Sequence, residues 1–74
     1  MAAIPYDVAH AFARRQYARS GNMVSMGDAV YSYALRLAHW SETSGLIVWD
    51  VDKDARQQSV TTSRHVRALR EVLA

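Results

Sequence analysis

The sequence contains no cysteine, so neither a disulfide framework nor a thiolate zinc site stabilises this chain of 74 residues. It has no apolar run near the roughly 20 residues that span a bilayer. Its first residues, MAAIPYDVAHAFARR, lack the basic segment that begins a signal peptide. A chain this short forms one domain, residues 1–74. We therefore expect a single cytoplasmic domain with no membrane segment.

The sequence also lacks the common catalytic and metal-binding patterns. The only imidazoles belong to His10, His39 and His65. No two of them have the spacing of four residues that places metal ligands on one helical face, and the sequence has neither a glycine-rich phosphate loop nor a G-x-S-x-G elbow. The alternating carboxylates Asp50, Asp52 and Asp54 lack the pattern of a calcium loop and favour a solvated turn. These absences predict a protein that is not an enzyme and holds no metal or cofactor.

Apolar residues are plentiful enough for a core, since they make up 50% of the chain. Near the start, Val8 and Phe12 belong to an apolar stripe at helical spacing. Pro5 precedes this stripe, where the first turn of a helix tolerates proline. We predict a helix from Pro5 to Arg19, which Gly21 ends.

The middle of the chain has the residues and turns of a β-meander. Aromatic and β-branched residues in AVYSY and LIVW fit a pleated surface, and Gly27-Asp28 is typical of a hairpin turn. The predicted strands are Asn22–Met26, Ala29–Tyr33, Leu35–Ser41 and Leu46–Val51. A helix over Ala29–Trp40 is the alternative, because this segment is also rich in leucine and alanine. Tyr31 and Tyr33 point to one face of their strand and Ser32 to the other, and the sequence leaves open which face meets the helices.

The C-terminal part returns to helix. Thr61 or Thr62 is expected to cap its N-terminus through the side-chain hydroxyl. Val66, Leu69 and Leu73 then form an apolar stripe. The predicted fold is α+β: an N-terminal helix, a four-stranded antiparallel β-meander and a C-terminal helix, with both helices packed on one sheet face.

Arginine supplies nearly all of the positive charge, since Lys53 is the only lysine. The net charge of +2 is too small to indicate nucleic-acid binding by itself. The candidate partner-binding residues form two clusters, Arg14, Arg15 and Arg19 near the start and Arg64, Arg67 and Arg70 near the end. The second cluster is expected to form a row on one side of its helix, facing solvent or clamping carboxylates or phosphates. Trp40 and Trp49, on neighbouring predicted strands, form either a core pair or exposed interface anchors.

Two segments of the chain resemble a known sequence pattern. Tyr31-Ser-Tyr-Ala34 and Ser59-Val-Thr-Thr-Ser-Arg-His65 are similar to the YSYG strand and the YSVTTSRH strand-to-helix junction of a short uncharacterised domain common in phage and mobile-element proteins. The likeness spans about residues 22–73, with Ala34 in place of the family's glycine and Gln58 in place of an aromatic residue. The resemblance implies a fold and a phage-like origin, but no established activity.

A compact phage-like protein, taken as complete from Met1 to Ala74 and without catalytic groups, is similar to the anti-CRISPR class. By that analogy, it binds a type I CRISPR effector complex or its nuclease in the host bacterial cytoplasm and blocks DNA recognition or nuclease recruitment. The alternative is a phage accessory protein whose arginine-rich face binds nucleic acid. A homodimer is also expected, because a small sheet gains stability when an exposed edge is paired.

Overall fold

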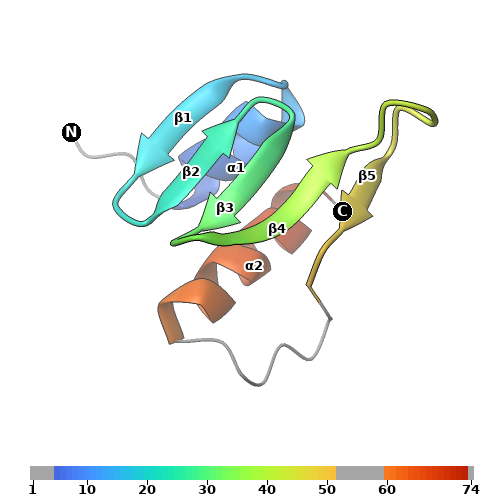
Figure 1. Ribbon diagram of the computed structural model, residues 1–74. Coiled ribbons are helices and arrows are strands. Elements are labelled where there is room, and N and C mark those ends of the chain that lie inside the picture. Colours follow the sequence, from blue (N-terminus) through green and yellow to red (C-terminus); the bar gives the residue numbers. More distant parts are fainter. Residues whose placement is uncertain (1–4, 52–59, 74) are drawn as a thin grey trace.

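The computed structural model describes residues 5–51 and 60–73. In chain order, one helix precedes the five strands and a second helix follows them (Figure 1). The elements, in chain order, are α1 (Pro5–Ala13), β1 (Tyr17–Ser20), β2 (Met23–Met26), β3 (Ala29–Ser32), β4 (Leu35–Trp40), β5 (Ile47–Trp49) and α2 (Val60–Leu73). The strands form one antiparallel sheet in sequential order, and both helices lie on the same face of it. The predicted α+β fold is confirmed, with five strands in place of four.

Two-residue turns connect the first four strands, and each has a positive φ at its first central residue. Gly21 and Gly27 occupy this position between β1 and β2 and between β2 and β3, with φ of 56° and 95°. Glycine adopts such a φ without steric cost. The predicted Gly27-Asp28 turn is confirmed, and β2 to β5 lie within the predicted strands. The helical alternative for Ala29–Trp40 is therefore wrong.

The first helix is shorter than predicted. It ends at Ala13, not at Arg19, because Arg15 takes a φ of 58° and turns the chain. The backbone N–H groups of Arg15 and Gln16 donate to carbonyls of the last helical turn at 3.0 and 2.8 Å, in the pattern of a Schellman motif. The next residues, Tyr17–Ser20, form β1, the strand that the sequence analysis missed.

A β-bulge interrupts the pairing of β3 with β4. The register shifts so that Leu37 and Ala38, both fully buried, lie opposite Val30. Without this extra residue, positions three apart in a strand would point to opposite faces. The bulge therefore brings Arg36 and His39 to the same face, the one away from the helices.

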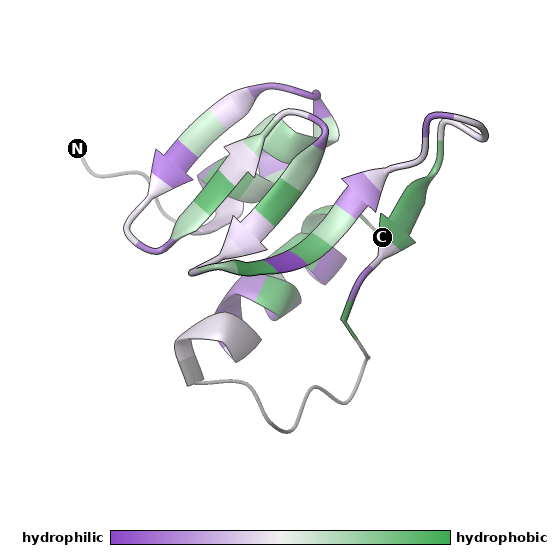
Figure 2. Cartoon of the chain, in the orientation of Figure 1, coloured by the Kyte–Doolittle hydropathy of each residue, from purple (hydrophilic) through white to green (hydrophobic). Residues whose placement is uncertain are grey.

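The core lies between the sheet and the two helices. Its buried apolar side chains are Val8, Ala9, Phe12, Met23, Val30, Leu37, Ala38, Val66 and Leu69. The predicted stripe of α2 is confirmed, and Leu73 packs partly buried at its end. Figure 2 shows both apolar and polar residues along β1 to β4 and apolar residues over most of β5. On β3, Ser32 is buried toward the helices and Tyr31 lies on the other face, which answers the question left open by the sequence.

The start of α2 also differs from the prediction. Because α2 begins at Val60, Thr61 and Thr62 lie inside its first turn and neither is the capping residue. Ser59, which precedes Val60 in the sequence, lies outside the described residues. The same is true of the predicted turn carboxylates Asp52 and Asp54.

Candidate partner-binding surface

The three arginines of α2 do not form one solvent-facing row, so this expectation was wrong for Arg70. Its guanidinium lies over the Trp49 ring, 4.3 Å from the centroid, and its Nε is buried without a hydrogen-bond partner among the described residues. Arg67 forms an ion pair with Glu71 at 3.7 Å. Arg64 is exposed. The indole face holds Arg70 against the protein, because a cation is attracted to the π-electrons of the ring.

We expect Arg70→Ala to lower the free energy of unfolding by about 1–2 kcal/mol, because it removes both the cation–π contact and the packing of the side-chain stem. The matched variant Arg64→Ala, at an exposed position of the same helix, should change it by no more than about 0.5 kcal/mol. Urea unfolding of both variants measures the difference. Equal values for the two would contradict a stabilising role for the contact with Trp49.

The N-terminal arginines also lie in different environments. The Arg15 guanidinium lies over the Trp40 ring, 4.3 Å from the centroid, and its Nη2 is 3.4 Å from the Gly45 carbonyl oxygen. Arg14 is exposed just after α1, and Arg19 projects from β1 on the face away from the helices. The structure therefore does not unite the six predicted residues in one surface. Those that stay exposed without a ring contact are Arg14, Arg19, Arg64 and Arg67.

Both tryptophans belong to the edge of the core. Trp40 and Trp49 are partly buried and pack against the core cluster. The Trp40 indole N–H donates to the Phe12 carbonyl at 3.0 Å, and the two ring centroids are 5.8 Å apart. Each indole also has an arginine on its face. Of the two alternatives, core packing is confirmed and exposed anchoring is wrong.

The two segments that carry the family resemblance meet inside the protein. The Ser32 hydroxyl lies 2.7 Å from His65 Nδ1 and 3.0 Å from Thr62 Oγ1. A serine and histidine at this distance are typical of a nucleophile and its base. Here Ser32 is 0% and His65 only 5% exposed, so burial keeps a substrate from the hydroxyl. We interpret the cluster as a structural network that joins β3 to α2 and satisfies buried polar groups.

Burial lowers the pKa of His65 below its ordinary value of about 6.5. As the pH falls through that value, the unfolded state binds more protons than the folded state, so the free energy of unfolding decreases on acidification. We expect this decrease between about pH 7.5 and 5 to be smaller in His65→Gln than in the wild type. Urea unfolding at both pH values measures it. The same pH dependence in the two proteins would contradict the role of His65.

No described element covers the second face of the sheet, which we call the open face (Figure 1). Tyr17 and Met26 lie opposite each other on β1 and β2 and are 63% and 56% exposed. Arg19 and Val24 form the neighbouring pair on the same face. Large exposed apolar side chains beside an arginine are typical of interaction surfaces. This surface was not predicted from the sequence, because Tyr17 and Arg19 were expected to lie in a helix.

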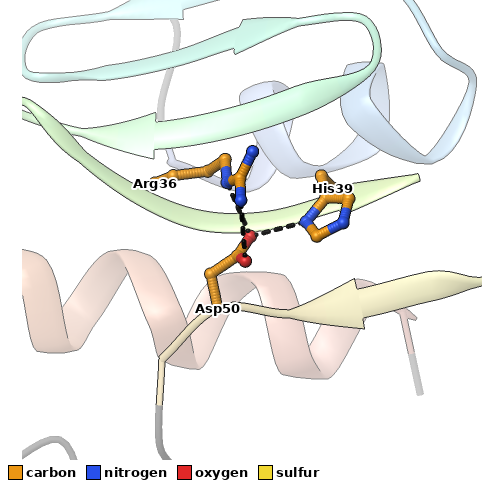
Figure 3. Close-up of polar contacts among 3 residues, drawn as sticks. All are labelled: Arg36, His39 and Asp50. Carbon is orange, nitrogen blue, oxygen red and sulfur yellow. Dashed lines mark hydrogen bonds and ion pairs between the residues drawn. The ribbon is translucent and has the colours of Figure 1, made fainter. Parts of the chain in front are cut away.

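A polar cluster occupies the β4 side of the open face (Figure 3). One carboxylate oxygen of Asp50 forms an ion pair with Arg36 Nε at 3.0 Å and lies 2.8 Å from His39 Nδ1. The other oxygen accepts a hydrogen bond from Arg36 Nη2 at 3.2 Å. A carboxylate on Nδ1 orients the imidazole for proton transfer in many enzymes, but no hydroxyl in the described part of the chain hydrogen-bonds His39. The cluster instead joins the end of β5 to β4, and the Asp50 carboxylate balances the positive charge of Arg36.

Among the described residues, no three metal-ligating side chains gather in one place, and no described helix is long and apolar enough to cross a membrane. Comparisons with protein-family models, curated proteins and solved structures found no match to this chain. The function is therefore inferred from the surface itself.

Proposed function

We propose that this protein acts without catalysis, by docking on a partner protein through the open face of its sheet. The observation that carries the proposal is the exposed apolar pair Tyr17 and Met26, with Arg19 beside it. Side chains that stay in water contribute little to folding, whereas tyrosine, methionine and arginine are enriched at protein interfaces. These exposed side chains are therefore better explained by contact with a partner than by the folding of the isolated domain.

The partner class favoured by the analogy in size and phage-like origin with anti-CRISPR proteins is a type I CRISPR effector complex or its nuclease, in the cytoplasm of the host bacterium. A specific interface buries about 800 Å² on each partner. The accessible surface of this small protein, 5048 Å², is large enough to supply that area from one face. A domain bound in this way inhibits by covering the surface that DNA or the nuclease would use.

The charges of the open face favour a protein partner over a nucleic acid. Arg36 is already paired with Asp50. Two exposed carboxylates, Asp28 and Glu42, line a shallow depression with Arg36 at the same end of the sheet. Nucleic-acid affinity comes mainly from unpaired cations that neutralise phosphates. The carboxylates on this face carry the same charge as a phosphate backbone and would repel it.

The test is protection of a phage or plasmid from CRISPR interference. The double variant Tyr17→Ala/Met26→Ala should lose protection, since truncating central anchors weakens binding by about 30- to 1,000-fold. The matched control Arg14→Ala/Arg64→Ala removes two exposed arginines outside the open face and should protect like the wild type. Melting temperatures of both variants establish that they are folded.

Three outcomes are informative. A wild-type protein that protects against no type I system overturns the assignment to CRISPR inhibition. A folded face variant that protects fully overturns docking through the open face. Duplex DNA binding that weakens steeply with salt and is lost in the arginine control favours the alternative, a nucleic-acid-binding accessory protein.

A further inference from the structure

A hollow opens on the β1–β2 side of the open face. Its volume is about 340 Å³, at the lower end of the range of small-ligand sites. Its lining includes Tyr17, Arg19, Asn22, Val24, Met26 and Tyr33. Four of the seven described lining residues are apolar or aromatic, so the hollow offers contact area to an apolar group of a partner.

Tyr33 is held in a strained backbone conformation beside the hollow. Its φ is 57° at the first central position of the β3–β4 turn, which glycine occupies in both preceding turns, at Gly21 and Gly27. A bulky residue with a positive φ brings its Cβ close to its own backbone. The side chain is 53% exposed, so core burial does not offset the strain. The Tyr33 backbone N–H donates to the Asn22 carbonyl at 2.7 Å, which holds the turn in place. Backbone strain of this kind clusters at functional sites.

Among the described residues that line the hollow, Arg19 is the only charged one. Its Nε lies 3.5 Å from the Gly21 carbonyl oxygen, which is long for a hydrogen bond. No carboxylate among the described residues forms an ion pair with it. A partner carboxylate next to the hollow would therefore meet an unpaired guanidinium and form a charge-assisted hydrogen bond.

We propose that the hollow is an anchor site for a large apolar or aromatic side chain of the partner, flanked by a carboxylate that pairs with Arg19. This inference rests on the proposed docking function and adds the chemistry of the partner's central residues. Tyr17 and Tyr33 supply aromatic contact area, and the flexible Met26 adapts to the shape of the guest side chain. A single anchor in such a pocket commonly dominates the energy of an interface.

The first experiment needs no identified partner. Isotope-labelled protein is titrated by NMR with N-acetyl-L-tryptophan, which has a ring and a carboxylate, and with N-acetyl-L-tryptophanamide, which lacks the carboxylate. We expect saturable shifts confined to β1, β2 and the Tyr33 turn, with a Kd on the order of 1 mM and about threefold weaker binding of the amide. Arg19→Gln should remove this threefold difference, whereas Arg36→Gln, on the same face outside the hollow, should keep it. Absence of saturable shifts at the hollow overturns the anchor site.

The second experiment uses Tyr33→Gly, which removes the ring and the strain together. We expect its Tm to rise by about 4 °C while N-acetyl-L-tryptophan binds about tenfold more weakly. It should also protect less against CRISPR interference than the wild type. Unchanged tryptophan binding by Tyr33→Gly overturns the anchor site. A wild type that binds the probe at the hollow but does not protect overturns CRISPR inhibition and leaves the anchor site supported.

Discussion

Phe12→Ala is expected to leave the protein largely unfolded at 37 °C. The Phe12 side chain is fully buried, and its ring centroid lies 5.8 Å from that of Trp40. Replacing a buried phenylalanine with alanine lowers stability by about 3–5 kcal/mol, because the lost apolar contacts leave a cavity. A single small core rarely supplies more than about 3–5 kcal/mol of net stability. The expected loss is therefore close to the whole stability of the fold.

Circular dichroism during urea unfolding measures this loss. Phe12→Leu is the matched control, because it keeps most of the buried volume and should lower stability by only about 1.5 kcal/mol. The carbonyl of residue 12, which accepts the Trp40 indole N–H, is retained in both variants. Similar losses for the two substitutions would mean that the volume of the Phe12 ring does not set the stability of this core.

Gly27→Ala is expected to have the next largest effect on folding, a loss of about 2–3 kcal/mol. Two causes add at this position. The φ of 95° is unfavourable for any residue with a Cβ, and that Cβ would lie 3.1 Å from the Arg15 carbonyl oxygen. Since the obstacle is backbone at the end of α1, the β2–β3 hairpin or the helix end has to shift. We expect Tm to fall by at least about 8 °C.

Gly21→Ala separates the two causes. Gly21 has a φ of 56°, but nothing lies within 4 Å of the position that its Cβ would occupy. This variant experiences only backbone strain, so its loss should be about 1 kcal/mol. The difference between the two variants measures the close approach of the hairpin to Arg15. Equal losses in thermal unfolding would contradict that contribution.

Much of the fold can be predicted from local pattern. The strands β2 to β5 follow from β-branched and aromatic residues between turns, and the buried stripe of α2 follows from the spacing of Val66 and Leu69. The end of α1 cannot be predicted in this way, because Arg15 occupies the left-handed position that glycine usually marks. Its guanidinium packs on Trp40, far along the chain, and a local pattern does not reveal that contact.

The sequence by itself determined the α+β class and the Gly27-Asp28 turn, because periodicity and turn chemistry act among residues a few positions apart. Tertiary structure alone decided the roles of the polar residues. Arg70 was expected to face solvent and instead lies on Trp49, and Ser32 is buried against His65. The composition of the open face is also a tertiary result, since Tyr17 and Arg19 lie on β1 and not in the helix predicted for them. Each of these outcomes depends on contacts between segments that are distant in the sequence, and such contacts form only when the hydrophobic core packs.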